Sequence, residues 1–520
     1  MFFSTFLIYK SCILYLSIPI LFFYFGWLKL GIGLLLSLLL LLASYVFLKL
    51  IRKQITVDTS IFLSKEHLTA FLIMFLFLLS TGNTGFMGSW GVDIPWRNAI
   101  YQDLIHQPWP VIYDYSHSMM CYYMVFWLVP AEISSLLHLN EFGSNLVLFL
   151  WLYIGLVLIF LLLCDVLKPK TDYVILIIIL FLFFSGINTF GMILKSIFIE
   201  PAPLISDLPG RTSWSFSDFC INGVETVLII RSVYLCIADV YNQFFAIAIS
   251  TLLFLKFRKN IEFYALIGLL TLPYSPLGFV GIFVIEVWEF IIHSLKQKNI
   301  QSATSQFRKI FSCANVLAII SLVPIFYFYF FMNANAEALV TAQSSGNYSF
   351  FSIPINKFNS AHLILLFFYY CFYFMIYARL IYSSYKNESL YYGVLFCLII
   401  FPFFKIGKTA DFNFNATICP FIILFVLIAN HLLKSFEANR FRMKEILLVF
   451  FLSVAMLTPV IQISTSIRAA YVNESFTYRW TPWDPKLSWN SFKDKEIGGF
   501  RNFLTPDYEK KIFYKYFAKK

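Results

Sequence analysis

Long runs of apolar residues, separated by short polar loops, dominate the pattern along this chain. Each run is about 17–25 residues long, which is the length a helix needs to cross a hydrocarbon core of about 30 Å. Backbone groups in lipid must be satisfied internally, so such runs form helices. The run 30–51 is too long and too continuous for a barrel strand, which alternates in polarity. The pattern predicts an all-α transmembrane bundle of about 13 spans, near 11–27, 30–51, 67–80, 143–166, 172–188, 234–255, 262–272, 278–294, 310–332, 361–382, 389–404, 415–434 and 445–466.

One stretch, 118–137, is less apolar than its neighbours and carries Pro130 and Glu132 at its centre. Proline interrupts a helix, and a carboxylate is costly in the middle of a membrane. We therefore expect this stretch to be an interfacial or half-buried helix, not a span.

Composition supports a membrane protein. The chain of 520 residues is 60% hydrophobic and only 13% charged, whereas soluble domains are about 45–50% apolar and about 25% charged. Its net charge of +11 does not indicate nucleic acid, because Lys and Arg cluster in short loops beside the spans, as the positive-inside rule expects. The nine cysteines form no CxxC pair and are interpreted as small buried hydrophobic residues.

These basic loops also give an orientation. If 118–137 does not cross, the loops that carry Arg52, Lys168, Lys256, Arg308 and Arg440 all fall on the cytoplasmic side. We then expect the N-terminus inside and the C-terminus outside. A transmembrane domain would cover 1–466, with outer loops 81–142 and 189–233, and 467–520 would form a short extracytoplasmic tail.

The first outer loop combines an acid, a base and amphipathic rings. Asp93 precedes a proline and is typical of a helix N-cap, with Arg97 and Asn98 about one turn later. Trp96 and Trp109 suit the headgroup layer of a membrane. This combination fits a site for a lipid with a charged head. The alternative is that Asp93 only caps a helix and the tryptophans only anchor the loop.

Arginines of the second outer loop are candidate phosphate ligands, because a guanidinium forks onto phosphate oxygens. Arg211 lies within the loop, and Arg231 precedes an apolar segment that also holds Asp239. Ionisable residues in such segments are normally paired. Arg231 and Asp239 are eight residues apart, so on one helix they would share a face. A plain solvated loop is the alternative.

The sequence shows no set of metal ligands. His106 and His117 have no nearby acid at ligand spacing, which argues against zinc. A divalent cation, Mg²⁺ or Mn²⁺, held by Asp93 and Asp103 stays open as an alternative.

An ordered set of motifs runs through most of the chain and resembles a family. The first pattern, D-x-x-W-x-N-A-x-x-x-D-L-I-x-x-x-W-P-V-x-Y, begins at Asp93 and ends at Tyr113. The next segments resemble "YYxxYWLPA", "YSPF", "GxxNDFxMRASIPA" and "FFKYL", and they begin at Tyr122, Tyr274, Gly407 and Phe513. Together they resemble bacterial membrane proteins similar to glycosyltransferases of the C-type fold (GT-C).

The resemblance implies an enzyme of the bacterial inner membrane that transfers a sugar from a polyprenyl-phosphate carrier to a glycan, lipid or protein acceptor on the outer face. In that superfamily an acid in the first outer loop acts as general base or orients the acceptor, which points to Asp93, with Asp103 as the second candidate. The candidate substrate-binding residues are Trp96, Arg97, Asn98, His106, Trp109, Arg211, Arg231, Lys405, Lys408 and Asp411.

One departure from the family pattern affects the predicted activity. Asn415 stands where the pattern has Arg, and Ala410 where it has Asn. If that Arg contacts a phosphate, Lys405 or Lys408 would have to replace it. Two other functions therefore stay open: a transporter or flippase, which would place charges in mid-span, and a non-catalytic scaffold of cell-envelope assembly.

Overall fold

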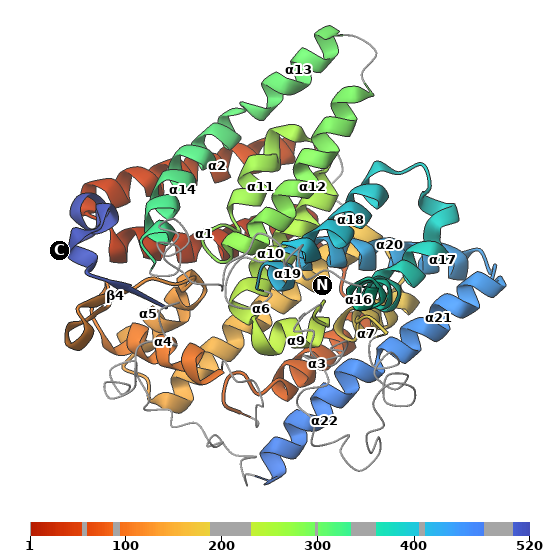
Figure 1. The fold of residues 1–520 in the computed structure, drawn as a ribbon, viewed down its shortest axis with the longest axis horizontal. Coiled ribbons are helices and arrows are strands. Elements are labelled where there is room, and N and C mark those ends of the chain that lie inside the picture. The colour runs from red at the N-terminus through yellow and green to blue at the C-terminus, as the bar shows by residue number, and fades with distance from the viewer. Residues whose placement is uncertain are drawn as a thin grey trace.

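A computed structural model describes residues 2–54, 60–86, 94–187, 230–296, 300–333, 360–404, 411–472 and 503–520. The described part is almost entirely helical (Figure 1). Its α-helices are α1 (Thr5–Trp27), α2 (Leu30–Gln54), α3 (Lys65–Ser80), α4 (Ile94–His106), α5 (Leu128–Leu136), α6 (Glu141–Leu167), α7 (Val174–Leu182), α9 (Val233–Asp239), α10 (Tyr241–Phe257), α11 (Tyr264–Leu269), α12 (Pro276–Leu295), α13 (Ile300–Ile310), α14 (Cys313–Phe331), α16 (Ser360–Tyr370), α17 (Ile376–Tyr385), α18 (Ser389–Ile400), α19 (Asp411–Ala416), α20 (Ile418–Glu437), α21 (Met443–Ala455) and α22 (Leu457–Val472).

Short strands occur at two places. Strand β1 (Phe2–Ser4) pairs antiparallel with β2 (Ser60–Phe62). Strands β3 (Ile112–Tyr113), β4 (Ser118–Met120) and β5 (Leu504–Pro506) form a three-stranded antiparallel sheet in the order β3-β4-β5. The chain is thus an all-α fold with two small sheets added to it.

Eight helical stretches in the described part are long and apolar enough to cross a membrane, by length and composition. This confirms a helical membrane protein. Four shorter apolar helices, of 10–17 residues, accompany them. The long stretches are Thr5–Trp27, Leu30–Lys53, Glu141–Leu167, Pro276–Leu295, Cys313–Phe331, Leu366–Tyr385, Asp411–Glu437 and Met443–Ser464.

The stretch 118–137 does not form a long helix. It contains β4, a 3₁₀ turn and α5, and α5 has nine residues, so it is about 14 Å long. That is less than half of the hydrocarbon thickness. Helix α5 packs on α4, α6 and α1, which agrees with the expected half-buried helix.

The loops rich in Lys and Arg meet at one end of the bundle. Asp165, near the end of α6, accepts hydrogen bonds from Tyr9 of α1 (2.5 Å) and from Lys256 of α10 (2.7 Å). Phe47 of α2 packs edge-on against Phe257, with ring centroids 5.8 Å apart. The C-terminal ends of α2, α6 and α10 are therefore neighbours.

The remaining basic loops join the same end. Ser312 donates to the carbonyl of Glu262 (2.6 Å), and Arg258 pairs with Glu388 (3.3 Å). Tyr173 stacks on Phe436. We call this the basic end; its cationic residues are Arg52, Lys53, Lys168, Lys170, Lys256, Arg258, Lys259, Arg308, Lys309, Lys434, Arg440, Arg442 and Lys444.

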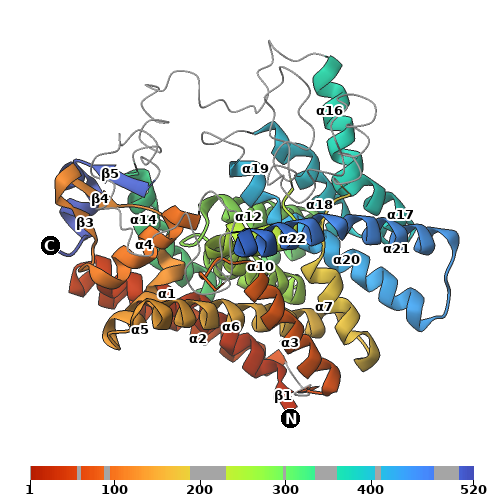
Figure 2. The ribbon, with the colours of Figure 1, turned by 90° about the horizontal axis from the view of Figure 1, so that it is seen from below.

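The C-terminal segment lies at the other end of α1, which we call the opposite end. Lys29 donates its backbone N–H to the carbonyl of Phe517 (2.8 Å), and Lys519 donates to Trp27 (2.8 Å). Strand β5 completes the sheet with β3 and β4 there (Figure 2). Residues 503–520 and the described part of the loop 81–142 thus lie together, away from the basic loops.

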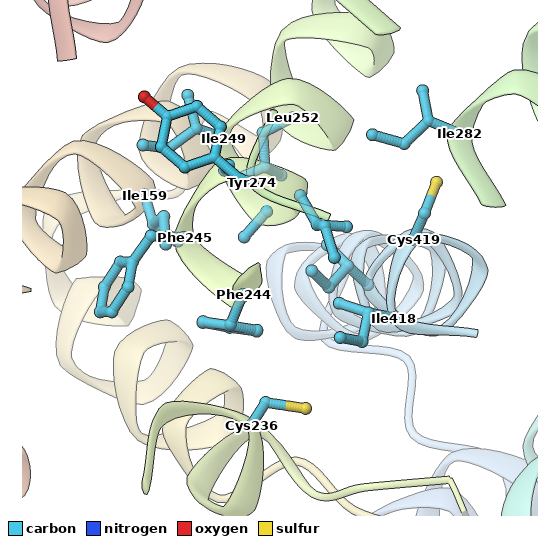
Figure 3. Packing of buried hydrophobic residues seen from close by; sticks show 14 of the residues in the cluster. Ile159, Cys236, Phe244, Phe245, Ile249, Leu252, Tyr274, Ile282, Ile418 and Cys419 are labelled. Carbon is cyan, nitrogen blue, oxygen red and sulfur yellow. The ribbon is translucent and has the colours of Figure 1, made fainter. Parts of the chain in front are cut away.

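Helices α10 and α20 pack against each other in the core, and Figure 3 labels buried residues of both. Nearly every residue of α10 is buried, and 94% of the apolar window in Asp411–Glu437 is buried. A helix that is apolar on all sides belongs in a core. Phe244 of α10 and Ile418 of α20 belong to this core. Because α9 precedes α10 and α19 precedes α20, both short helices are held in the protein interior.

The predicted single span 234–255 is wrong in one respect. The helix breaks at Val240, which has φ −123° and ψ 35°, so α9 ends at Asp239 and α10 begins at Tyr241. Polar residues on both sides of the break, Asp239 and Asn242, are buried. Broken helices in membrane proteins expose backbone groups to a site inside the protein.

Candidate functional site

Two buried arginines share one buried carboxylate at the break between α9 and α10. Asp239 Oδ1 lies 3.2 Å from Arg97 Nη1, and Asp239 Oδ2 lies 3.1 Å from Arg231 Nη2. All three side chains are at most 7% exposed. A buried charge is stable only when it is paired and hydrogen-bonded. The carboxylate of Asp239 therefore holds two guanidinium groups at one place.

Helix α4 positions Arg97. Four residues later, Tyr101 lies on the same face of the helix and donates to the carbonyl of Ser144 at the start of α6 (2.7 Å). Ala99 and Ile100 are fully buried. The helix is fixed on α5 and α6 by these contacts, so the guanidinium of Arg97 has a fixed direction toward α9.

Arg231 reaches the site from just before α9, so Arg231 and Asp239 do not share a helix face as the spacing predicted. Ser232 caps α9, accepting from the N–H of Leu235 (3.0 Å), and donates to Gln462 of α22 (2.8 Å). The guanidinium of Arg231 lies over the ring of Phe414, 4.5 Å from its centroid. This stacking connects the site to α19.

The Nε of Arg231 is buried and has no hydrogen-bond partner among the described residues. A buried donor without a partner costs about 1–3 kcal/mol. Such groups in a native fold need an explanation, and an absent ligand is one. The unused donor is compatible with an anion that binds beside Asp239.

Asp411 and Tyr123 complete the surroundings of Arg97. Burial raises the pKa of the half-buried Tyr123 phenol well above its usual range; Tyr122 and the Asp411 carboxylate raise it further, and Arg97 opposes them. Both charged groups therefore lie within electrostatic reach of one phenol, which stays neutral at physiological pH. Asn242 of α10 donates to the carbonyl of Tyr123 (3.4 Å).

Helix α19 is fixed at its C-terminal end. A Cβ on Gly281 of α12 would lie 2.2 Å from the carbonyl oxygen of Ala416, so only glycine permits this approach. Asn415, which stands where the family pattern has Arg, is 4% exposed. Its amide donates to the carbonyl of Asp411 (3.0 Å), and its Oδ1 has no partner among the described residues.

Asp103, the second predicted acid, forms structural contacts. Its carboxylate accepts hydrogen bonds from Tyr113 (2.8 Å) and Gln107 (3.2 Å), and the residue is 1% exposed. These bonds fasten α4 to β3. The geometry favours a positioning role over direct contact with a substrate.

The other predicted residues of α4 and its following loop differ in exposure. Trp96 and Asn98 are half-buried, and His106 is exposed at the end of the helix. Trp109 donates to the carbonyl of Leu104 (2.9 Å) and packs on Trp27, with ring centroids 5.2 Å apart. Trp109 thus anchors the loop on α1, as the alternative interpretation expected.

Four predicted residues lie outside the described residues: Asp93, Arg211, Lys405 and Lys408. Three residues of the cluster were not predicted as site residues: Asp239, Tyr123 and Phe414. The sequence carried one signal for Asp239, an acid in an apolar segment, and its spacing predicted a pair with Arg231. Nothing in the spacing indicated that Arg97 would be the second partner.

Among the described residues, no group of three or more His, Cys, Asp or Glu side chains is arranged to hold a metal ion. The cation proposed between Asp93 and Asp103 falls partly outside those residues. It stays a prediction.

An apolar groove of about 600 Å³ runs between α11, α12 and α14. Helix α14 has 19 residues and is about 28 Å long, close to the hydrocarbon thickness. The groove is lined by Tyr264, Ala265, Leu269, Leu272, Pro276, Phe279, Phe283, Glu286, Val287, Phe290, Ile310, Ile319, Val323, Phe326, Tyr327, Phe330 and Phe331.

One ring of the groove lining packs on the loop beside the arginine cluster. The ring of Phe330 lies 6.2 Å from that of Tyr123, the phenol that both Arg97 and Asp411 influence. Asn333, just after α14, donates to the carbonyl of Cys121 (2.8 Å). The end of α14 beside the groove is therefore packed on the loop that precedes α5.

No family model matches the chain, and no curated protein or solved structure matches it either. A function for this chain therefore has to be argued from its own geometry.

Proposed function

We propose that this chain is a membrane glycosyltransferase that takes a sugar from a polyprenyl-phosphate carrier, with a GT-C-like arrangement of about 13 spans. It would work at the bacterial inner membrane with the basic end inside and the opposite end outside. One observation carries the proposal: Phe330 of an apolar groove packs on Tyr123, and Arg97 of a buried arginine pair lies within electrostatic reach of that phenol.

The groove fits an isoprenoid chain. Its lining is apolar apart from Glu286 and two tyrosines. An aqueous solute would gain little from such walls, whereas an isoprenoid tail already lies in the hydrocarbon core and can pack on them by van der Waals contact. Since the groove follows α12 and α14, a tail held there would lie roughly along the membrane normal.

The arginine cluster fits the carrier phosphate. Guanidinium groups bind phosphate oxygens in pairs of parallel hydrogen bonds. Asp239 pre-orients Arg97 and Arg231, and Arg231 keeps one buried N–H that no described residue uses. Because Phe330 of the groove packs on Tyr123 and Arg97 acts electrostatically on that phenol, the proposal places the phosphate at the end of a bound tail near these groups.

Sugar transfer at this site requires one bond exchange. The acceptor oxygen forms a bond to C1 of the sugar while the bond from C1 to the carrier phosphate oxygen breaks. Asp93, which lies outside the described residues, would take the proton of the acceptor hydroxyl. Arg97 and Arg231 would stabilise the negative charge on the departing polyprenyl phosphate.

A transporter or flippase is the second candidate, and Glu286 favours it. This residue of α12 is buried and lines the apolar groove, and its Oε1 has no partner among the described residues. Gly268 of α11 allows its carboxyl to approach the backbone. A carboxyl within a span often marks a transport pathway.

Reconstituted protein and radiolabelled polyprenyl-phosphate sugars separate these functions. Liposomes would contain the full chain, one of a panel of hexosyl and pentosyl donors, and an envelope extract as acceptor. A transferase moves label from the lipid phase to the acceptor, and Arg231→Gln abolishes this. Donor that crosses the bilayer with its sugar still attached would instead indicate a flippase. If the protein neither transfers label nor moves any donor across the bilayer, the non-catalytic scaffold becomes the favoured interpretation.

A further inference from the structure

A second hollow, of about 230 Å³, lies at the basic end between α17, α20 and α21. Three of the long apolar stretches, Leu366–Tyr385, Asp411–Glu437 and Met443–Ser464, end or begin beside it. A point shared by the ends of three spans lies at the level where the hydrocarbon core meets the headgroup layer. The hollow is therefore at a membrane surface and far along α20 from the arginine cluster.

Cationic side chains converge on this hollow. Lys434, Arg440, Arg442 and Lys444 line it, together with the polar groups of Ser384, Tyr385, Ser435 and His431. Glu445 is the one carboxylate among its lining residues. The positive-inside rule explains why basic residues occur at this end, but it does not require four of them to surround one cavity.

Glu445 is already engaged. Its Oε2 accepts from the backbone N–H of Arg442 (3.0 Å), and its Oε1 lies 3.4 Å from Lys444 Nζ and 3.3 Å from His431 Nε2. Lys444 also donates to Ser383 (2.8 Å). Among the described residues, no carboxylate lies within ion-pair distance of Lys434, Arg440 or Arg442. These three charges remain available to an anion.

A fixed turn presents the two arginines. Asn439 has φ 51°, and the backbone N–H of Arg440 donates to the carbonyl of Ser435 (3.0 Å). These are the features of a helix end closed by a left-handed residue, which satisfies the last carbonyls of α20. The turn then leads within a few residues into α21, so both arginines lie around one hollow.

The hollow opens beside an apolar face. Met443, Ile446 and Phe450 follow one another along α21 and are 70%, 52% and 56% exposed. Residues three and four apart lie on one side of a helix. A ligand at this place would therefore meet positive charge at one end and an apolar surface below it, which fits an amphipathic molecule better than a free anion.

We propose that this hollow binds the phosphate headgroup of an anionic glycerophospholipid, whose acyl chains lie along the exposed face of α21. The volume supports a headgroup, because pockets that enclose whole small molecules measure about 300–1,000 Å³. Basic pockets between spans on the cytoplasmic side are suited to such headgroups. The inference does not depend on the proposed transferase activity.

Nanodisc experiments test this proposal. The full chain would be placed in nanodiscs of phosphatidylcholine with increasing fractions of phosphatidylglycerol, and thermal unfolding would be followed. We expect phosphatidylglycerol to raise the unfolding temperature, because a ligand that binds the folded state stabilises it. The double variant Arg440→Gln plus Arg442→Gln should lose this rise. On extraction it should retain about one tenth, or less, of the phosphatidylglycerol that the natural chain retains.

A matched control removes two charges elsewhere at the same end. Arg308 and Lys309 of α13 are exposed and do not line the hollow, so Arg308→Gln plus Lys309→Gln should respond as the natural chain does. An equal loss in this control would overturn the proposal, since general surface charge would then explain the effect. If the arginine variant does not fold, Ala438→Phe is informative, because it fills the hollow and keeps every charge.

Two further outcomes decide the ligand. Inorganic phosphate in phosphatidylcholine nanodiscs should give no rise in unfolding temperature; a rise equal to that with phosphatidylglycerol would show a free-anion site and overturn the lipid assignment. Ala438→Phe should abolish the response to phosphatidylglycerol. A normal response in this variant would show that the lipid does not enter the hollow.

Discussion

At the scale of single residues, Asp239 determines the geometry of the proposed site. It pairs with Arg97 and Arg231 at distances of 3.2 and 3.1 Å. Removal of one partner from a buried ion pair typically costs about 3–5 kcal/mol, because an uncompensated charge stays behind. Substitution of Asp239 would leave two buried guanidinium groups unpaired and confound folding with function, whereas a change of one arginine leaves Asp239 paired with the other. A single arginine and Asp93 are therefore better targets for functional tests.

Asp93→Asn should abolish sugar transfer and leave the protein folded. The amide is nearly isosteric and still accepts a capping hydrogen bond. If Asp93 only caps the helix, its replacement would lower the stability of the protein by at most about 1–2 kcal/mol. Loss of a general base lowers the rate by about 10²–10⁴-fold. Transfer assays with matched protein amounts and melting curves would separate the two roles; full activity of the variant would refute the assignment.

Asp103→Asn should lower the stability of the protein and leave sugar transfer intact, the reverse of the result expected for Asp93→Asn. Its carboxylate accepts from Tyr113 and Gln107 in a buried setting, so we expect a loss of about 1–3 kcal/mol of stability with transfer retained by the folded fraction. Thermal unfolding and activity per folded molecule would be measured together. If the variant melts normally but has lost transfer, and EDTA abolishes transfer by the natural chain, the shared cation is favoured instead.

Arg231→Lys tests whether the guanidinium fork matters beyond its charge. Lysine keeps the positive charge but cannot form paired hydrogen bonds or stack as a plane on Phe414. We expect binding of a photoreactive polyprenyl phosphate to weaken by about tenfold or more. Arg379→Lys on α17 is the control, because Arg379 is exposed and distant in sequence from the cluster. Equal binding by both variants would exclude Arg231 from the phosphate site.

At the scale of elements, the long apolar runs were predictable and the breaks were not. The runs 30–51 and 143–166 match α2 and α6 closely, because length and hydropathy alone specify a spanning helix. The break of 234–255 at Val240 lies beside Asp239, which pairs with Arg97, 142 residues away. Local sequence carries no information about such a partner.

The groove between α12 and α14 gives a prediction at this scale. Ile319→Trp together with Val323→Trp would place two large rings in the groove that these residues line. We expect crosslinking of the photoreactive polyprenyl phosphate to fall several-fold, because the tail loses its space. Ile320→Trp is the matched control: Ile320 is 48% exposed on the same helix and does not line the groove. A loss in the control of equal size would mean that the groove does not hold the tail.

At the scale of the whole molecule, the clustering of basic loops at one end was predictable from charge alone. Five separate loops meet there through contacts such as Lys256 with Asp165 and Tyr173 with Phe436. In the alternative, 118–137 crosses the membrane. The basic loops that come after it in the chain would then lie at the opposite end of the bundle from the loop that follows α2. The observed contacts join Phe47 of α2 to Phe257 of α10, which agrees with the non-crossing arrangement. Which end faces the cytoplasm is a matter for experiment.

Cysteine labelling in inside-out and right-side-out vesicles tests the proposed orientation. Ser118 and Ser144, which flank the stretch 118–137, are 3% and 2% exposed and would not react, so exposed neighbours are needed. In a background without native cysteines, Asp114→Cys and His138→Cys should react with an impermeant maleimide only from outside. Both positions lie in exposed turns at the opposite end. Lys259→Cys, exposed at the basic end, should react only from the cytoplasmic side.

The three positions together separate every arrangement. If 118–137 crossed the membrane, Asp114→Cys and His138→Cys would react from different sides. If the whole bundle were inverted, both would react from inside and Lys259→Cys from outside, and the proposed site could not meet an acceptor on the outer face. The positive-inside rule favours the predicted pattern, because about a dozen cations at the basic end would otherwise have to be moved across a hydrocarbon core.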